Sequence, residues 1–292
     1  MSSKSLVVTG ATGQLGRLVV ESLLEKGVSP ERIVATARDT SRLSDLADRG
    51  VQVRHADYTD PTSLKEAFAG ADRVLLISGS EVGQRVPQHQ NVIDAAQEAG
   101  IELLAYTSVA NADTSGLALA TEHIATEQAI VTSGLPHSLL RNSWYTENYT
   151  GQLPTYLEHG AVLGAAGEGR VSAATRADFA EAAAVALLAE EPKRVYELGG
   201  AAFTMAELAA TVTEVTGQEV SYNDLPVPAL TEVLVGAGLP EPYAAILADA
   251  DQGLARGELY VETTDLEALL GRPATSLTDA VRSAAASTSV TG

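Results

Sequence analysis

The first half of the chain alternates short apolar stretches with longer stretches of helical periodicity, and this alternation limits the possible folds more than any other feature. The apolar stretches, which we expect to be strands, cover residues 5–9, 32–37, 51–55, 73–78, 101–108 and 136–141. Helical patterns begin at Leu15 and then span about 86–99 and 121–132. Strands that alternate with helices predict a parallel, doubly wound sheet of the Rossmann type with helices on both faces.

The second half of the chain has a looser pattern. We expect an Ala-rich helix over 178–188 and strands over 194–198 and 219–224. Thr204 and Glu207 have the spacing of a capping box, which predicts the start of a helix, and a last helix is expected from about residue 276. We therefore predict a Rossmann domain over residues 1–150, completed by parts of 175–200. A smaller, mostly helical lobe over residues 151–292 would be interleaved with it and cover the substrate.

A glycine-rich loop connects the first expected strand to the first expected helix. Gly10 permits a tight turn, Gly13 lets the backbone approach a pyrophosphate, and Gly16 allows close packing of the helix on the strand. The start of the helix then offers free N–H groups to phosphates. This context indicates a dinucleotide-binding site rather than an ordinary turn. The residues expected to contact the cofactor here are Gly10, Ala11, Thr12, Gly13, Gln14, Leu15 and Gly16.

The end of the second strand discriminates between NAD and NADP. An acidic side chain at this position binds the ribose 2′-hydroxyl, whereas an arginine pairs with a 2′-phosphate. Arg38 comes first and Asp39 follows it, so we favour NADP(H). Asp39 is equally natural as a turn residue, and Arg38 has a solvated surface position as its alternative.

The ends of the third and fourth strands supply further candidates for the cofactor site. Asp57 either accepts a hydrogen bond from the adenine amino group or forms the turn before Pro61. Ser78, Gly79 and Ser80 follow the fourth strand, and the carboxyl ends of parallel strands line the ligand crevice. We therefore expect these small residues to border the middle of the cofactor.

Composition excludes several classes of function. The formal net charge of −19 disfavours direct binding of nucleic acid, because such a surface repels phosphates. The absence of cysteine excludes disulfides, thiolate metal sites and cysteine nucleophiles, and we expect no metal. The sequence contains no signal-peptide pattern and no apolar run approaching ~20 residues, so we expect a cytoplasmic protein without membrane contact.

The chain contains no tyrosine followed by a lysine four positions later, a pair that protonates the carbonyl oxygen in many nicotinamide-dependent reductases. General acid help of that kind contributes ~10²–10⁴-fold to the rate. Reduction of ordinary ketones or aldehydes by that route is therefore disfavoured. His123 lies in an expected helix and is a residue type that titrates near neutral pH, although a lone helical histidine is more often structural.

An aromatic stretch follows the sixth strand, at residues 141–149. It holds the only tryptophan, Trp144, together with Tyr145 and Tyr149. Aromatic walls with a few amides suit a flat, planar substrate. The alternative is that Trp144 and Tyr145 pack the junction between the two lobes.

Several stretches resemble a known family, and three of them are longer than the glycine motif. They are TGATGQLG (9–16), ADY (56–58), LLISGSEVGQR (75–85), AYTS (105–108), RNSWYTENY (141–149), GAAGEGRVSAATRADFA (164–180) and VYELGG (195–200). On these stretches the chain resembles the NmrA-like branch of the atypical short-chain dehydrogenases, and within it the bacterial NADPH-dependent quinone oxidoreductase 2 group. The resemblance runs nearly end to end, and the family also lacks the Tyr-x-x-x-Lys pair.

The resemblance implies NADPH as the cofactor and a quinone as the substrate. It implies cofactor binding through residues 10–15, Arg38, residues 78–80 and residues 142–147, which include Asn142, Trp144 and Tyr145, with Arg176 nearby. A quinone is already a strong hydride acceptor, so it needs less polarisation than a ketone. Asn142 and Gln14 are our candidates for the catalytic residues that donate hydrogen bonds to the developing oxyanion.

A second function from a different class remains open at this point. NmrA-like proteins include redox sensors that bind NADP(H) without turning it over and that regulate a partner. The missing Tyr-x-x-x-Lys pair fits a sensor as well as it fits an enzyme. The stretches 75–85 and 141–149 favour the enzyme, and the sequence leaves monomer and homodimer as alternatives.

Overall fold

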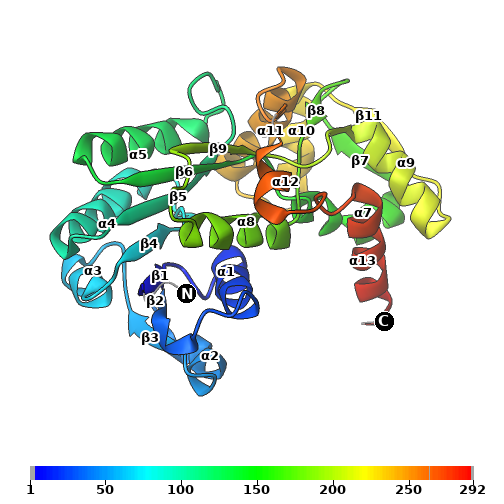
Figure 1. Cartoon of the computed structure of the whole chain (residues 1–292). Coiled ribbons are helices and arrows are strands. Elements are labelled where there is room, and N and C mark those ends of the chain that lie inside the picture. The colour runs from blue at the N-terminus through cyan, green and yellow to red at the C-terminus, as the bar shows by residue number, and fades with distance from the viewer. Residues whose placement is uncertain (1–3, 263, 291–292) are drawn as a thin grey trace.

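The computed structural model describes residues 4–262 and 264–290, and a seven-stranded sheet dominates it (Figure 1). The strand order is β3-β2-β1-β4-β5-β6-β9, and every neighbouring pair is parallel. The strands are β1 (Leu6–Val8), β2 (Ile33–Ala37), β3 (Gln52–His55), β4 (Arg73–Leu76), β5 (Leu103–Val109), β6 (His137–Asn142) and β9 (Val195–Leu198). Most are buried on both faces, which explains why they read as continuous apolar runs rather than alternating ones.

Helices cover both faces of this sheet, which confirms the predicted fold class. One face carries α1 (Gln14–Glu25) and α8 (Arg176–Leu188), which pack against each other, with α12 (Asp265–Leu270) beside α8. The other face carries α3 (Pro61–Phe68), α4 (Arg85–Ala99) and α5 (Ala120–Ser133). The short elements η1 (Pro30–Arg32), η2 (Thr40–Leu43) and α2 (Ser44–Asp48) connect β1, β2 and β3 at one edge.

Local signals set the ends of these helices. Gly27 and Gly100 follow α1 and α4 and have φ angles of +77° and +65°, the left-handed conformation that ends many helices. The predicted capping box begins α9: the Glu207 N–H donates to Thr204 Oγ1 at 3.1 Å, and the Thr204 N–H donates to Glu207 Oε2 at 2.7 Å. Both signals act through the neighbouring backbone alone, so they are visible in the sequence.

The rest of the chain forms a lobe at one end of the sheet (Figure 1). Its core gathers apolar side chains from several short elements, including Phe203, Leu208 and Leu254. Two small sheets stiffen the lobe: β7 pairs with β11 in parallel, and β8 pairs with β10 antiparallel. The elements are α6 (Glu147–Thr150), α7 (Leu153–His159), β7 (Ala161–Gly164), β8 (Arg170–Val171), β10 (Phe203–Thr204), α9 (Met205–Thr216), β11 (Ser221–Asp224), α10 (Val227–Gly236), α11 (Glu241–Ala255) and α13 (Leu277–Val290).

The chain passes between lobe and sheet more than once. It leaves the sheet after β6, forms β7 and β8 in the lobe, and returns to the sheet as α8 and β9. This path is why a single cut near residue 150 does not separate two folded units. Among the described residues, no helix has the length and apolar character needed to span a membrane.

Candidate functional site

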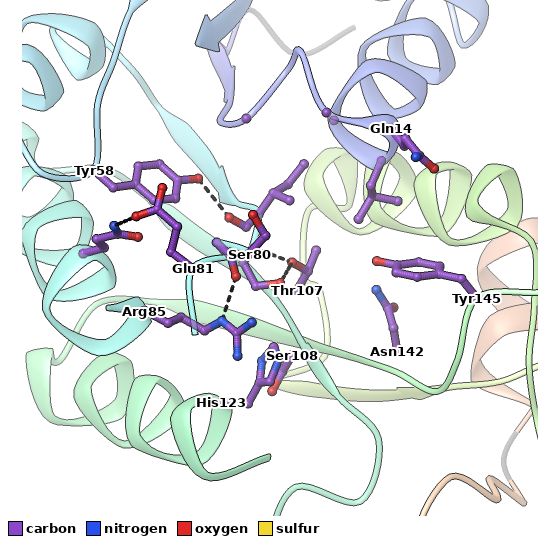
Figure 2. Close-up of a pocket in the computed structure, with 18 of the residues that line it drawn as sticks. Gln14, Tyr58, Ser80, Glu81, Arg85, Thr107, Ser108, His123, Asn142 and Tyr145 are labelled. Atoms are coloured by element: carbon purple, nitrogen blue, oxygen red, sulfur yellow. Dashed lines mark hydrogen bonds between the residues drawn. The ribbon is translucent and has the colours of Figure 1, made fainter. Parts of the chain in front are cut away.

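A cleft of about 510 Å³ lies at the carboxyl ends of the central strands (Figure 2). Its walls come from the loops after β1, β2, β3 and β4, from the end of β5, and from the residues that follow β6. The sheet order reverses between β1 and β4, and ligands of open α/β sheets bind at such a switch point. The position of the cleft alone therefore makes it the candidate site.

The glycine loop has the geometry that the sequence motif predicts. Gly10 has a φ of +60°, a conformation that side chains rarely adopt, and its carbonyl accepts from the Gly13 N–H at 2.9 Å. A Cβ added at Gly16 would lie 2.4 Å from the Gly10 carbonyl oxygen. The loop can therefore turn this tightly against α1 only with glycine at both ends of the motif.

The start of α1 faces the cleft without a side-chain cap. Its N-cap is Gly13, whose lack of a side chain leaves the first N–H groups of the helix available, and no acidic residue lies in the first turn. Free N–H groups and the positive end of the helix dipole form a site for an anion. These residues fit the diphosphate of a dinucleotide.

Arg38 lies at the mouth of the cleft, where the sequence suggested a 2′-phosphate partner. Its side chain is 70% exposed, and Nη1 lies 3.1 Å from Oε1 of Glu81, which follows β4. Asp39 instead accepts from the Ser41 N–H at 3.1 Å and caps η2. Asp39 therefore acts as a turn residue here, and Arg38 keeps its predicted role as a hypothesis.

Asp57 forms the turn that the sequence offered as one of its two interpretations. Its Oδ1 accepts from the N–H of Thr59 at 2.8 Å, and this bond helps to lower the pKa of the carboxyl group. The side chain thus forms the turn before α3. Asp57 also lines the cleft, so an adenine contact remains a prediction.

The loop after β4 is held from three directions. The Ser78 N–H donates to Thr107 Oγ1 at 2.9 Å, and the Gly79 N–H donates to His89 Nε2 at 3.0 Å. The Gly79 carbonyl accepts from Arg85 Nε at 2.8 Å. The backbone of this loop is therefore fixed along the middle of the cleft, as expected for residues that border a cofactor.

Asn142, Trp144 and Tyr145 form the wall on the other side of the cleft. Asn142 is buried, and its Oδ1 has no hydrogen-bond partner among the described residues. Burial raises the pKa of the Tyr145 phenol, although the charge of Arg176 and a hydrogen bond with Asn142 offset part of the rise. The Arg176 guanidinium lies 4.6 Å from the centre of the Tyr145 ring. A protonated phenol and a carboxamide thus stand side by side (Figure 2).

The two aromatic residues pack the junction between the lobes, as one of the two interpretations expected. Tyr145 contacts the core of the sheet, with its ring 5.7 Å from that of Phe179, whereas Trp144 packs against the core of the lobe. Both residues also line the cleft, so a contact with a flat substrate stays a prediction. This wall of the cleft is therefore anchored in two separate cores.

His123 has the surroundings of a structural histidine, the interpretation that the sequence analysis favoured. The ring is buried beside Tyr106, whose hydroxyl lies 2.8 Å from His123 Nδ1. Burial, with the charge of Arg85, lowers the pKa of His123 to about 3, and the same causes lower the pKa of His89 to about 3. Both histidines are therefore neutral, and His123 is not a proton donor for catalysis at neutral pH.

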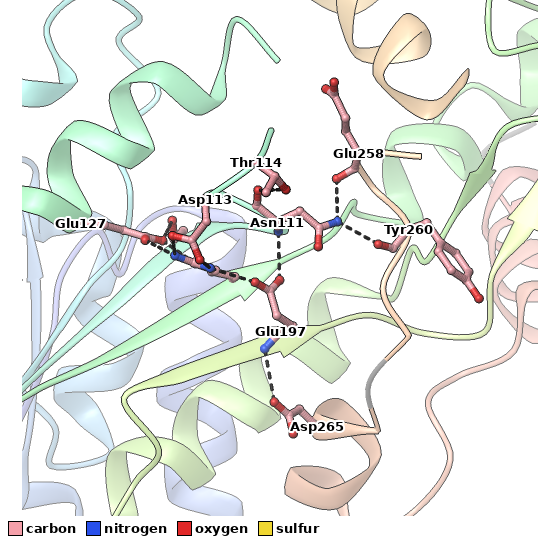
Figure 3. Close-up of polar contacts among 10 residues, drawn as sticks. Asn111, Asp113, Thr114, Glu127, Glu197, Glu258, Tyr260 and Asp265 are labelled. Carbon is pink, nitrogen blue, oxygen red and sulfur yellow. Dashed lines mark hydrogen bonds and ion pairs between the residues drawn. The ribbon is translucent and has the colours of Figure 1, made fainter. Parts of the chain in front are cut away.

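A network of polar contacts centred on Arg141 supports the cleft from outside (Figure 3). The guanidinium contacts three carboxylates: Asp113 at 2.7 Å, Glu127 at 2.6 Å and Glu197 at 3.0 Å. Glu197 also accepts from the N–H of Asn111, whose side chain donates to the carbonyls of residues 258 and 260. The network ties β6, α5 and β9 to the lobe, so it fixes the strand that leads into Asn142.

The structure brings nearly all the predicted site residues together. Ala11 is an exception, and residues 146 and 147 also lie outside the lining. The predicted residues that line the cleft are Gly10, Thr12, Gly13, Gln14, Leu15, Gly16, Arg38, Asp57, Ser78, Gly79, Ser80, Asn142, Trp144, Tyr145 and Arg176. Gln14 makes no side-chain hydrogen bond with Asn142 among the described residues. The roles of these residues stay predictions.

Sequence reasoning missed several polar residues of the cleft. They are Glu81, Arg85, Gln88, Thr107, Ser108 and Asn148. Thr107 and Ser108 lie near the end of β5, and carboxyl ends of strands are the positions that carry ligand contacts. That signal was available for these two residues. Arg85 and Gln88 carry no such signal, because they lie on α4 and reach the cleft only through packing.

Comparison with known proteins places the chain in a family. A model described as the NmrA-like family matches residues 2–279. Quinone oxidoreductase 2 of Escherichia coli (strain K12) is 48% identical over 278 residues, which cover 94% of this chain and 97% of that protein.

Two solved structures share the whole fold. The crystal structure of an NADPH-dependent quinone oxidoreductase from Escherichia coli, complexed with NADPH, has a TM-score of 0.92 and 47% identity over 94% of this chain and 98% of that chain. Triphenylmethane reductase from Citrobacter sp., complexed with NADP(H), has a TM-score of 0.91 and 40% identity over 96% of this chain and 100% of that chain.

Proposed function

This chain belongs to the NmrA-like family, and from that premise we propose that it is an NADPH-dependent quinone oxidoreductase. The observation that carries the proposal is the near-full-length identity with quinone oxidoreductase 2. The same relationship supports an enzyme over a sensor that binds NADP(H) without turnover. Cytoplasmic location, the lack of nucleic-acid binding and a monomeric or dimeric state stay predictions.

The residues of the cleft fit NADPH at each of its parts. The uncapped start of α1 offers N–H groups to the diphosphate, and the fixed loop at residues 78–80 runs along the middle of the cleft. Arg38 is the candidate for the 2′-phosphate, because a guanidinium pairs with phosphate oxygens in a bidentate manner. When bound, NADPH supplies a hydride that, with one proton from water, converts a quinone into a hydroquinone.

The chain itself contributes orientation and hydrogen-bond donors. Tyr145 and Trp144 offer aromatic surface for a flat ring, and their anchoring in two cores keeps that surface in place. The carboxamide of Asn142 and the protonated hydroxyl of Tyr145 can donate to an oxygen on which negative charge develops. Gln14 lies at the start of α1 and is the second candidate donor. Most of the rate enhancement then comes from proximity and from these donors.

No residue of the cleft has to act as a general acid at neutral pH. His123 is neutral because burial lowers its pKa to about 3, and burial raises the pKa of Tyr145 above its ordinary value. Quinone reduction tolerates the lack of a general acid, because the anionic oxygen that remains after hydride transfer can take its one proton from water. This match between acceptor and site favours quinones over simple ketones.

The deciding experiment follows the loss of NADPH absorbance with a small quinone, beside an NADH control. We expect loss that depends on the quinone and that is faster with NADPH than with NADH. Tight binding of NADP(H) without loss of absorbance across several quinones would overturn the enzymatic function and favour the sensor. Equal rates with both cofactors would leave the enzyme standing but remove Arg38 from its predicted role.

A further inference from the structure

Arg85 is a buried cation on the cleft wall to which the proposed function gives no task. It is the first residue of α4, its side chain is 6% exposed, and it lines the cleft. A charged side chain is seldom buried without partners, because removal from water costs more than one or two contacts return. The position of Arg85 therefore calls for an explanation.

The guanidinium of Arg85 has fewer partners than its burial requires. Nε donates to the Gly79 carbonyl at 2.8 Å. Nη1 lies 3.5 Å from a Glu122 carboxylate oxygen but has no hydrogen-bond partner among the described residues. The one side-chain hydrogen bond of Arg85 within the described part of the chain is that of Nε, so Nη2 is also left without a partner there. A buried group with unused N–H donors beside a cleft is built to meet an acceptor that is not part of the chain.

The other two arginines of the cleft are committed elsewhere. Arg38 pairs with Glu81 at the mouth, and Arg176 donates to Asn148 Oδ1 at 3.0 Å beside the Tyr145 ring. Arg85 is thus the cation of the inner wall, where Figure 2 shows it extending toward Ser108 and His123. His123 adds no charge there, because it is neutral.

Ser108, beside Arg85 in Figure 2, does not compete for the role of donor. Its hydroxyl donates to Glu127 Oε1 at 2.5 Å, and both oxygens of Glu127 also accept from Arg141. Because Arg141 donates to both oxygens of that carboxylate, the Ser108 hydroxyl is the donor in its bond to Glu127, and its proton stays directed at Glu127. Ser108 therefore presents lone pairs to the cleft, and the donors of the inner wall belong to Arg85.

We propose that Arg85 is a substrate-binding residue that donates hydrogen bonds to a ring oxygen of the quinone. This inference rests on the proposed function. Figure 2 shows Asn142 and Tyr145 on one side of the cleft and Arg85 with Ser108 on the other. A 1,4-quinone carries oxygens at opposite ends of its ring, and hydride arrival leaves negative charge on one of them while the other stays a hydrogen-bonding group. Donors on two sides of the cleft match that class of substrate, and a guanidinium binds more strongly as the charge grows.

A purely structural role for Arg85 makes a different prediction. Its bond to the Gly79 carbonyl helps to hold the loop that borders the cofactor. If that were its only task, loss of the side chain would weaken NADPH binding and quinone turnover together. A substrate-binding role separates the two, because the quinone loses a donor while the loop keeps its bonds to Thr107 and His89.

The experiment compares Arg85→Met and Arg85→Lys with wild type, and uses Arg194→Met, which removes an exposed arginine outside the cleft, as the control. The dissociation constant for NADPH is measured by nicotinamide fluorescence without quinone. Steady-state kcat and KM are then measured with 1,4-benzoquinone. We expect Arg85→Met to lower kcat/KM for the quinone by roughly 10- to 100-fold, the effect of one charged hydrogen bond, with the NADPH constant changed less than twofold. Arg194→Met should match wild type in both measurements.

Three outcomes overturn the inference: unchanged kcat/KM, NADPH affinity that falls in step with kcat/KM, or an equal effect from the control. If Arg85→Met does not fold, Arg85→Lys decides, because it keeps the charge near Glu122 but loses the planar fork, and it should still raise KM for the quinone.

A calorimetric titration keeps this inference separate from the proposed function. It measures binding of 1,4-benzoquinone to the NADP⁺-loaded protein, where no turnover occurs. The wild-type protein could bind the quinone without turning it over, and Arg85→Lys could weaken that binding. This result would overturn the enzymatic function and support the quinone-binding role of Arg85. Equal affinity, or no binding by wild type, would overturn Arg85.

Discussion

The cleft is lined by two kinds of surface. One, which we call the backbone wall, is the glycine loop at residues 10–16 with the uncapped start of α1. The other, which we call the side-chain wall, comprises Arg85 and Ser108 together with Asn142 and Tyr145 across the cleft from them. The backbone wall recognises an anion through N–H groups and permits no larger residue, whereas the side-chain wall offers individual donors and acceptors that packing holds in place. Damage to the first should abolish binding of the cofactor, and damage to the second should affect mainly the substrate.

The largest effect is expected from Gly16→Ala in the backbone wall. The new Cβ would lie 2.4 Å from the Gly10 carbonyl oxygen and 2.9 Å from its carbon, so α1 has to move. Overpacking of this kind costs about 1–3 kcal/mol of stability. A displacement of about 1 Å can lower activity by roughly 100-fold. We therefore expect a lower melting temperature and NADPH affinity reduced by at least that order.

Gly236→Ala is the control for Gly16→Ala, because a Cβ there meets no atom within 4 Å. Removing a glycine from the end of a helix should leave stability unchanged or raise it by up to about 1 kcal/mol. If Gly16→Ala binds NADPH as wild type does, the backbone wall does not depend on close packing.

Asn142→Ala tests the side-chain wall. Loss of one preorganised donor to an oxyanion typically costs roughly 10²–10³-fold in turnover, and the lower end is expected because a quinone needs less help. Steady-state kinetics should show the fall in kcat, while NADPH affinity, measured by fluorescence, should change less than threefold. Asn223→Ala, at an exposed site outside the cleft, should match wild type. A parallel fall in NADPH affinity would instead assign Asn142 to the cofactor.

Arg38→Gln tests how much a single side chain, compared with the backbone wall, contributes to binding of the cofactor. Removal of the guanidinium should lower the preference for NADPH over NADH by roughly tenfold, because a charged hydrogen bond to the 2′-phosphate is lost. Rates with NADH should not change. The ratio of kcat/KM for the two cofactors measures the effect, and an unchanged ratio would place the phosphate elsewhere.

Glu81→Gln is the companion variant and should act in the opposite direction. Glu81 pairs with Arg38 at 3.1 Å, so its carboxylate competes with a phosphate for the same guanidinium. Exposed pairs of this kind contribute about 0.2–1 kcal/mol, so NADPH affinity should rise only about two- to fivefold. NADH affinity serves as the internal control.

A change in pH is expected to have the smallest effect on turnover, and its main effect is on stability. His89 and His123 keep pKa values of about 3 in the folded chain, against an ordinary value of 6.5. Below pH 6.5 these histidines therefore bind protons in the unfolded chain but not in the folded chain. The free energy of unfolding falls for this reason as pH drops from 6.5 toward 3. Turnover should show no ionisation near pH 6.5 from these histidines. Chemical unfolding at several pH values measures the slope, which His123→Gln should reduce.

Asp251 changes the pH dependence of stability in the opposite direction, so its effect has to be distinguished from that of the histidines. Burial raises the pKa of Asp251 to about 6, so the folded chain holds a proton that the unfolded chain releases between pH 3.8 and 6. Its contribution favours the folded state at low pH and is lost as pH rises through 6. An acid slope that stays the same in His123→Gln would assign the effect to groups other than His123.

The sequence predicted the parts of the fold that local signals determine. Most strands of the large sheet are buried, whereas the edge strand β3 is partly exposed. Gly27, Gly100 and the Thr204–Glu207 capping box end or begin helices through neighbouring backbone alone. In the lobe, β11 lies within the strand predicted over 219–224, but β7, β8 and β10 escaped prediction because they depend on distant partners. β8 and β10 have two residues each and exist only because distant segments pair, and β7 pairs with residues some sixty positions later.

The candidate site also contains residues whose place the sequence predicts and residues whose place depends on packing. The glycine loop and Arg38 follow strands directly, so their place at the cleft was predictable. Arg85 reaches the cleft from the first position of a helix, which no pattern in the sequence reveals. His123 shows a second limit. Its charge depends on burial beside Tyr106 and Arg85, and that burial arises from packing between α4, α5 and β5.

The return of the chain to the sheet has a consequence for synthesis on the ribosome. Leu139–Asn142 of β6 pair with β9, and α8 packs against α1, although about 150 residues separate those two helices. Until β9 has left the exit tunnel, β6 presents an unpaired edge and α1 an uncovered apolar face, which are the features that promote aggregation of nascent chains. The cofactor-binding half therefore cannot mature early as an independent unit. Its completion waits for about two thirds of the polypeptide to be translated.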